Sequence, residues 1–167
     1  YMSKEVDRSV RESELVLTTS NFTKKEVQEL LDVPGERIRV VYAAPSLAEE
    51  AADYEMVKRK YETGDAYILF VSTIEPRKNI SRLIRAFDAV KRRSEFPHKL
   101  ILAGGSGWNN DEIYETARNS AYRKDIVFTG YISGEEKNAL YQHASMLVFP
   151  SLYEGFGMPP LEAMSWG

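Results

Sequence analysis

The chain has 167 residues, of which 43% are hydrophobic and 28% charged, and its formal net charge at pH 7 is −3. This composition is typical of a soluble globular protein, and so slight an acidity gives no reason to expect binding to nucleic acid or to an anionic membrane surface. The lack of cysteine excludes disulfides and thiolate metal sites. No apolar run approaches the ~20 residues of a membrane-spanning helix, and the N-terminus shows no signal-peptide pattern, so we expect a cytoplasmic protein.

The first 45 residues predict short strands and helices. Residues 14–20 (ELVLTTS) have the composition of a strand, and Ser20 is placed to cap a helix from about residue 22 to residue 31. Pro34 and Gly35 favour a turn after this helix. The segments expected to follow are a strand over 37–42, a linker over 43–45 and a charged helix over 49–62.

Beyond residue 65, short apolar segments alternate with helices. The segments rich in β-branched and aromatic residues are read as buried strands over 66–72, 99–104, 125–130 and 145–149. The helices between and after them are expected over 79–93, near 110–121, over 133–143 and from 159 onward. This alternation predicts an α/β fold, with a Rossmann-like parallel sheet and flanking helices.

Two of these helices have recognisable starts. Asn79 is placed to cap the helix that runs to about Arg93. Ser133, with Glu136 three positions later, forms a capping-box pattern at the start of the other helix. The first of these helices has an apolar face, which we expect to be buried. It carries Ile80, Leu83, Ile84, Phe87 and Val90.

Residues 150–167 (PSLYEGFGMPPLEAMSWG) carry the most informative pattern of the chain. Glu154 and Glu162 stand eight positions apart across a turn rich in glycine and proline, and Pro159 suits the first turn of a helix. Glu154 is then expected at the carboxyl end of the strand 145–149, at the edge where open parallel sheets bind ligands. Two carboxylates, glycine amides and a helix N-terminus suit a sugar joined to a phosphate.

A structural interpretation of this turn stands beside the functional one. Glu162 would then be a first-turn glutamate that interacts favourably with the helix dipole, by about 0.3–1 kcal/mol. The glycines would be ordinary turn residues. The spacing of the two carboxylates does not by itself choose between these interpretations.

A second group of candidate residues follows the strand 66–72. Arg77 and Lys78 stand just ahead of the helix that begins at Asn79, where their charge adds to the amide dipoles. A diphosphate suits this position, because arginine binds two oxygens at once and lysine acts as a point charge. The alternative is a solvated basic loop.

Three further positions give weaker indications. Gly104 and Gly105 follow a strand, where they either let a ligand approach the backbone or form an ordinary loop. Tyr131 follows the strand 125–130, where an aromatic residue is most often a packing residue. His98 and His143 show no ligand pattern and are expected to be structural, and no two aspartates occur at i and i+2, so no Asp-x-Asp metal site is expected.

The string EGFGMPPLEAM (154–164) resembles, nearly residue for residue, the E-x7-E signature of the retaining glycosyltransferases of family 4, or glycosyl transferases group 1. These enzymes have the GT-B fold. The string VSTIEPRKNISRLIRAF (71–87) resembles their donor-phosphate loop, in which Lys78 matches the usual phosphate-binding lysine. The chain departs from this pattern at Ser72 and Thr73, where many members carry Gly-Arg, and Arg77 is expected to compensate for the lost cation.

A third segment, SNFTKKEVQELLDVPGERIRVVYAAPS (20–46), is similar to the end of the family's N-terminal domain. The resemblance implies that residues 1–45 are the end of that acceptor-binding domain and the hinge. Residues 46–167 would then form the nucleotide-sugar donor-binding domain, incomplete at its C-terminus. We therefore expect a truncated C-terminal half of a GT-B fold that is inactive by itself, with the strand 145–149 as an exposed edge able to form a dimer.

The resemblance also implies roles for the candidate residues. Glu162 would hydrogen-bond the ribose hydroxyls, and Glu154 would hold hydroxyls of the donor sugar. Arg77 and Lys78 would stabilise charge on the departing diphosphate, and with Glu154 they are the expected catalytic residues. The backbone of Ile132 would read the base. The other expected donor contacts are Gly155, Phe156, Gly157, Met158, Thr73, Gly104, Gly105 and Tyr131.

These roles imply transfer of a sugar from a nucleotide-diphosphate donor to a glycan or lipid-linked acceptor, with retention of configuration, in polysaccharide or lipopolysaccharide biosynthesis. The segment STIEPRKN resembles mannosyltransferases, so GDP-mannose is the expected donor, and no cofactor or metal is expected. The acceptor would bind mainly to the preceding domain, and the full enzyme is expected to associate peripherally with a membrane.

Alternatives from other classes remain. The chain could be a nucleotide-sugar binding fragment without catalysis, or part of a GT-B sugar epimerase. A dinucleotide-dependent oxidoreductase is disfavoured, because no G-x-G-x-x-G motif follows the strand 66–72.

Overall fold

The computed structural model describes residues 4–45 and 50–166. The contacts divide the chain into two compact units. Unit 1 combines the described part of Tyr1–Ala44 with Glu154–Met158, and unit 2 combines the described part of Pro45–Tyr153 with that of Pro159–Gly167. Each unit has its own sheet; unit 1 has one buried cluster, and unit 2 has two.

Unit 1 is a small α/β unit whose two strands pair in parallel, with Val16 opposite Ile38. Ser20 adopts extended backbone geometry and its side chain accepts a hydrogen bond from the Thr23 amide, so it caps the second helix as its sequence predicts. The buried residues Leu31, Val33 and Ile38 form the core. The elements are helix α1 (Lys4–Glu12), strand β1 (Val16–Thr18), helix α2 (Asn21–Leu31), the 3-10 turn Gly35–Arg37 and strand β2 (Ile38–Val40).

Unit 2 is built on a four-stranded parallel sheet in the order β5-β4-β3-β6. This confirms the predicted α/β fold with a parallel sheet. The central strand β3 (Tyr67–Val71) is buried along its whole length, as its continuous apolar run predicts for a strand covered on both faces. The other strands are β4 (Lys99–Ala103), β5 (Ile126–Gly130) and β6 (Met146–Leu147).

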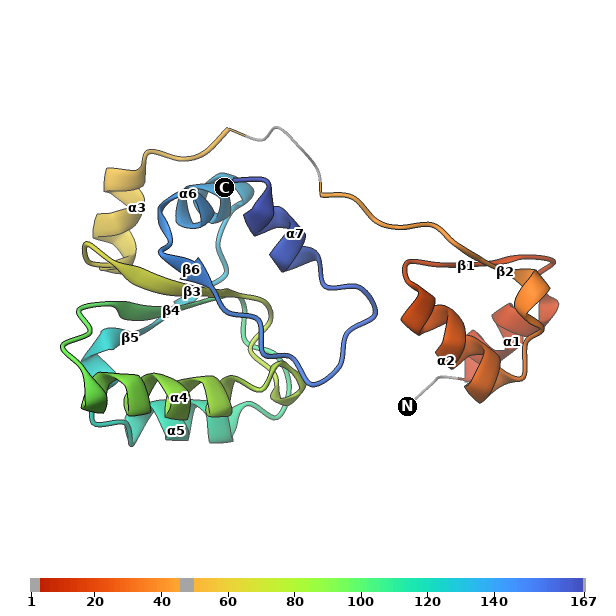
Figure 1. The fold of residues 1–167 in the computed structure, drawn as a ribbon, viewed down its shortest axis with the longest axis horizontal. Helices are drawn as coiled ribbons and strands as arrows, with labels where there is room; N and C mark the ends of the chain where they lie inside the picture. The colour runs from red at the N-terminus through yellow and green to blue at the C-terminus, as the bar shows by residue number, and fades with distance from the viewer. Residues whose placement is uncertain (1–3, 46–49, 167) are drawn as a thin grey trace. The chain divides into compact units, whose positions relative to one another are not determined.

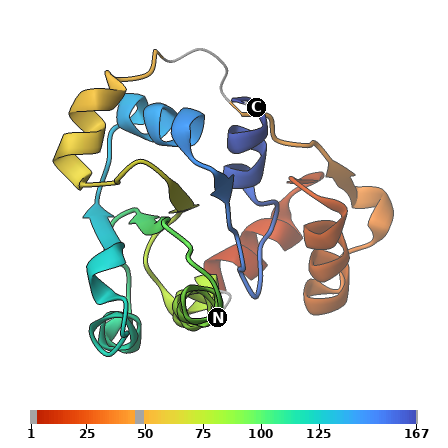
Figure 2. The ribbon, with the colours of Figure 1, turned by 60° about the vertical axis from the view of Figure 1, so that its left-hand side comes forward.

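Helices cover both faces of this sheet (Figure 1, Figure 2). One face packs against α4 and α5 around Phe70, Ile84 and Ile113. The other face packs against α3 and α6 around Leu69 and Leu140, and α7 lies on this same side. The helices are α3 (Tyr54–Tyr61), α4 (Ile80–Arg93), α5 (Asp111–Arg118), α6 (Gly134–His143) and α7 (Met158–Met164). None of the described helices is long and apolar enough to cross a membrane.

Several predicted details of unit 2 are wrong. Val90 is 44% exposed and is not among the residues that α4 buries, which are Ile80, Leu83, Ile84 and Phe87. Asn79 does not cap α4 through its side chain; it has a left-handed backbone, with φ at 59°.

The predicted strand 145–149 pairs over only two residues, and Met146 is 50% exposed, so this is an edge strand and not a buried one. Its short ladder has a partner on one side only, which is strand β3. The charged helix predicted over 49–62 begins at Tyr54. Its N-cap is Asp53, whose side chain accepts a hydrogen bond from the Glu55 amide. The prediction for residues 46–49 lies outside the described residues.

Candidate functional site

Arg77 lies in a 3-10 turn, Pro76–Lys78, between strand β3 and helix α4. Its guanidinium donates to Glu75 Oε1 from Nε at 3.1 Å and from Nη2 at 2.7 Å, and to the carbonyl of Tyr153 from Nη1 at 2.6 Å. Trp108 Nε1 donates to the other oxygen of Glu75 at 3.1 Å. Arg77 is therefore held in a fixed position, where it supports the chain segment that follows β6.

Two more hydrogen bonds fasten that segment to the loop before α4. The Leu152 amide donates to the Arg77 carbonyl at 2.9 Å, and Asn79 Nδ2 donates to the Pro150 carbonyl at 3.1 Å. The side chain of Asn79 thus joins two loops in place of the cap that the sequence predicts. The loop of the candidate phosphate residues and the segment leading to Glu154 are tied together at the carboxyl edge of the sheet.

Lys78 is almost completely buried, with 6% of its surface exposed. Its Nζ atom lies 5.4 Å from the centre of the Phe149 ring, a distance at which the face of an aromatic ring attracts a cation. Burial of a lysine is uncommon in proteins and requires compensating interactions. The alternative interpretation of this position was a solvated basic loop. It does not hold for Lys78, because this side chain is buried.

The glycine loop after strand β4 packs closely on residues that follow β3. Gly104 has φ at +144°, and a Cβ atom there would lie 2.0 Å from the Ser72 carbonyl oxygen. A Cβ atom on Gly107 would lie 2.7 Å from Cγ2 of Thr73. Gly105, in contrast, has no atom within 4 Å of its Cβ position. Gly104 is therefore required by packing, whereas the Cβ position of Gly105 is open.

Glu162 lies on helix α7 and is held by two residues of helix α6. Lys137 Nζ lies 2.9 Å from Oε1 of Glu162, and the hydroxyl of Tyr141 donates to Oε2 at 2.9 Å. Burial, together with the nearby charge of Glu162, raises the pKa of Tyr141 above its usual range. The sequence reasoning missed both partners, although their i, i+4 spacing places them on one face of a helix.

The first carboxylate of the motif belongs to the other unit. Glu154 and the turn after it are grouped with unit 1, where the Gly155 carbonyl accepts hydrogen bonds from the hydroxyls of Ser20 and Thr23. In the same turn, the ring of Phe156 lies 6.3 Å from that of Tyr42, Gly157 has φ at +88°, and Met158 begins helix α7. Glu154 and Glu162 lie in different units, so their joint action on one ligand stays a prediction.

The loop after strand β5 presents Tyr131 to solvent, with 87% of its surface exposed. Tyr131 therefore does not pack against the core. The side chain of Ile132, in contrast, is 9% exposed and belongs to the core. His98 stacks on a phenylalanine and His143 on a tyrosine, and no group of histidine or carboxylate residues that could hold a metal ion occurs in the described ranges.

The parallel α/β fold of unit 2, with its candidate residues at the carboxyl edge of the sheet, is that of a GT-B glycosyltransferase. Residues 53–167 match the family model described as glycosyl transferases group 1, and the chain belongs to this family. The match confirms the resemblance inferred from the two sequence motifs.

Similar proteins agree with this assignment. The chain is 34% identical to the O-antigen chain mannosyltransferase B of Escherichia coli, over 100% of this chain and 45% of that protein. It is 32% identical to the serotype-specific mannosyltransferase WbdA of the same organism, over 100% of this chain and 21% of that protein. The chain thus spans less than half the length of these relatives. A crystal structure of Anabaena HepE with UDP-glucose has the same fold, with a TM-score of 0.80 and 16% identity over 99% of this chain and 47% of that one.

Proposed function

We propose that this chain is the donor-binding part of a retaining mannosyltransferase that uses GDP-mannose. The observation that carries the proposal is the fixed carboxylate of Glu162, held on α7 by Lys137 and Tyr141 within the family's E-x7-E motif. A carboxylate has about four acceptor positions, so it can accept hydrogen bonds from two ribose hydroxyls while keeping both protein donors. The mannosyltransferase relatives support mannose as the sugar.

We assign the stabilisation of negative charge on the leaving diphosphate to residues at the start of α4. Lys78 supplies a desolvated positive charge, and the N-terminal amides of α4 add their dipoles. Stabilisation of charge that develops in the transition state is usually the largest catalytic contribution. Arg77 takes part chiefly by holding the segment that leads to Glu154, through its bond to Tyr153.

Glu154 is proposed to hold hydroxyls of the donor sugar, with the amides of Phe156, Gly157 and Met158 beside it. Glu154 is the one side chain of this group with a nucleophilic oxygen, and we assign it to the sugar hydroxyls and not to attack on the anomeric carbon. We therefore infer internal return: the bond between the anomeric carbon and the diphosphate breaks, the leaving phosphate accepts the proton of the acceptor hydroxyl, and the acceptor oxygen bonds to the anomeric carbon on the face that the diphosphate has left. This route retains the anomeric configuration.

The same relatives support a proposal for the acceptor and the cellular role. A glycan or lipid-linked acceptor in polysaccharide or lipopolysaccharide biosynthesis is proposed, because one relative is named for O-antigen chain synthesis. A cytoplasmic location and a peripheral membrane association of the full protein belong to the same proposal.

Calorimetric titration with GDP, UDP, GDP-mannose and UDP-glucose tests the donor site. We expect one nucleotide series to bind, and Glu162→Gln to weaken that binding about tenfold, which is about 1.4 kcal/mol. Glu29→Gln is the matched control, because its carboxylate is exposed and pairs with the exposed Lys25 at 3.7 Å. Absence of nucleotide binding, or equal affinities for Glu162→Gln and the unsubstituted chain, would overturn the proposal.

A further inference from the structure

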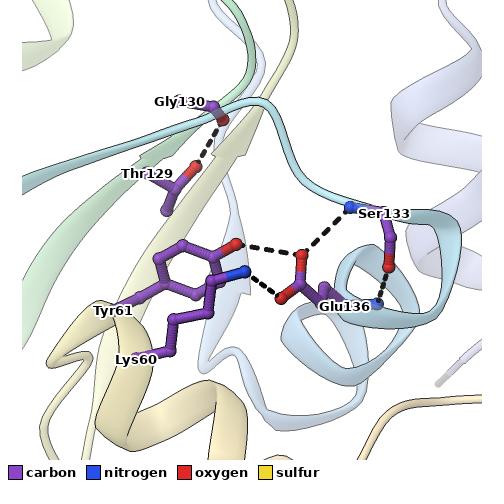
Figure 3. Close-up of polar contacts among 6 residues, drawn as sticks. All are labelled: Lys60, Tyr61, Thr129, Gly130, Ser133 and Glu136. Atoms are coloured by element: carbon purple, nitrogen blue, oxygen red, sulfur yellow. Dashed lines mark hydrogen bonds and ion pairs between the residues drawn. The ribbon is translucent and has the colours of Figure 1, made fainter.

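The carboxylate of Glu136 joins helix α3 to the first turn of helix α6 (Figure 3). Lys60 Nζ lies 2.5 Å from its Oε1 atom, and the hydroxyl of Tyr61 donates to Oε2 at 2.9 Å. The Ser133 amide donates to the same Oε2 at 3.1 Å, and the Glu136 amide donates to Ser133 Oγ at 3.2 Å. A capping box is usually a local interaction. Here its carboxylate, that of Glu136, also binds two residues of a helix more than 70 residues away in sequence.

The electrostatics keep this carboxylate charged. The side chain of Glu136 is 17% exposed, and burial alone would raise its pKa. The hydrogen bonds from Lys60, from the Ser133 amide and from Tyr61 outweigh burial and lower that pKa. The same contact raises the pKa of Lys60 to about 12. A charged acceptor with three donors fixes the start of α6 more firmly than a solvated capping box does.

The segment that this arrangement fixes is the loop Gly130–Ser133, between β5 and α6. Its first residue is anchored, because the Gly104 amide donates to the Gly130 carbonyl at 3.1 Å. Its last residue is anchored by Glu136. Between the two anchors, Tyr131 is 87% exposed, and no described residue hydrogen-bonds the peptide N–H or C=O of Ile132.

The exposed ring of Tyr131 and the peptide groups of Ile132 together suit the binding of a planar heterocycle. The ring offers a surface on which a nucleobase can stack. The adjacent N–H and C=O groups offer one donor and one acceptor to the edge of the base. Recognition by one N–H and one C=O group depends on the position of these two groups. The anchors at both ends of the loop fix that position and so determine which base fits.

Helix α3 is also tied to this region by its backbone. The Ala52 amide donates to the Glu135 carbonyl at 3.0 Å, and α3 follows directly with Asp53 as its N-cap. The side chains of α3 and the residues before it therefore contact the first turn of α6 at two places. Both contacts lie immediately next to the loop.

We propose that Lys60 and Tyr61 are positioning residues that set the selectivity for the nucleobase by holding the Gly130–Ser133 loop through Glu136. This inference rests on the proposed function and goes one step further, because the inference itself places the base of the donor nucleotide at that loop. It predicts that loss of the α3 contacts changes recognition of the base and leaves recognition of the diphosphate unchanged. A purely structural role would instead weaken both.

The test compares the affinities of GDP, UDP and inorganic pyrophosphate for Glu136→Gln, Tyr61→Phe and Lys60→Met. Lys58→Met is the matched control, because Lys58 lies on the same helix and pairs with the exposed Asp65 at 2.7 Å, away from α6. We expect Glu136→Gln to reduce the ratio between the GDP and UDP affinities three- to tenfold. Tyr61→Phe and Lys60→Met should each reduce it two- to fivefold, while pyrophosphate affinity and the control stay unchanged.

Hydrogen exchange of the 131–133 amides gives a second measurement, and it should be faster in the three variants than in the control. A selectivity ratio that is unchanged in all three variants would overturn the inference while leaving the proposed function intact. Equal losses of pyrophosphate and nucleotide affinity would overturn it as well, since they indicate a general loss of structure. Failure of the unsubstituted chain to bind any nucleotide would overturn both proposals.

Discussion

The Nζ atom of Lys137 lies 2.9 Å from Oε1 of Glu162 and joins two helices that have no other ion pair between them in the described part of the chain. Tyr141, one turn further along α6, donates its hydroxyl to the other oxygen of the same carboxylate at 2.9 Å. The two donors approach different oxygens. The orientation of the Glu162 carboxylate is therefore determined by α6.

Removal of either donor should weaken nucleotide binding without abolishing it. We expect Lys137→Met and Tyr141→Phe each to raise the dissociation constant about tenfold, since a hydrogen bond to a charged group contributes about 1.5 kcal/mol. Calorimetry against the preferred nucleotide measures the effect. Lys25→Met is the control, because Lys25 forms an exposed pair with Glu29 at 3.7 Å. Unchanged affinity in both variants would show that the orientation of Glu162 does not depend on α6.

The two glycines after β4 should respond differently to a methyl group. Gly104→Ala places a Cβ atom 2.0 Å from the Ser72 carbonyl oxygen at a φ of +144°. Strain and overpacking together should cost roughly 3 kcal/mol or more in the free energy of unfolding. Gly105→Ala meets no atom within 4 Å and should change that free energy by less than about 0.5 kcal/mol. Urea unfolding distinguishes them, and a similar cost for both substitutions would contradict the packing described here.

The fold was predictable where local signals agree. The continuous apolar run 66–72 and the Ser133–Glu136 capping box each predict an element that the structure contains. Helix α1 was not predicted, because Val6 and Val10 are the only apolar residues among its nine. The exposure of Val90 was missed for another reason, since helical periodicity indicates an apolar face but does not say which residues of that face the neighbouring elements cover.

The candidate site was predictable as a set of sequence positions but not as a set of contacts. Family motifs indicated Lys78 and Glu162, and their roles stay predictions. The partners of Glu162 lie 25 and 21 residues away, and those of Glu136 lie 76 and 75 residues away. Such pairs depend on how α3, α6 and α7 pack together, and no local pattern encodes that packing.

The pH dependence of stability should reveal the charge of Glu136. Its lowered pKa means that its contribution to stability is complete above the unfolded-state value near 4.5 and is lost as the pH falls through the lower folded-state pKa. Between pH 5 and pH 3, the free energy of unfolding should therefore decrease more for the unsubstituted chain than for Glu136→Gln. Urea unfolding across this range measures the difference. Parallel curves would contradict a charged Glu136.

The opposite sign applies to Lys60. Its raised pKa makes its contribution complete below 10.5, and the contribution is lost as the pH rises through about 12. Both groups therefore contribute fully between pH 5 and pH 10, so a nucleotide titration in that range does not change the Lys60–Glu136 contact.

Two neighbouring cations should differ in their effect on diphosphate binding. Lys78 is 6% exposed, whereas the guanidinium of Arg77 already donates to Glu75 and to the Tyr153 carbonyl. We expect Lys78→Met to weaken pyrophosphate binding tenfold or more, since a charge-assisted contact contributes roughly 1.5–3 kcal/mol. Arg77→Met should lower the thermal unfolding temperature, because it frees the segment after β6, and should weaken pyrophosphate binding by less than about threefold. Calorimetry and thermal unfolding of both variants separate these effects. The reverse order of pyrophosphate affinities would assign the diphosphate contact to Arg77 and leave Lys78 as a residue of the core.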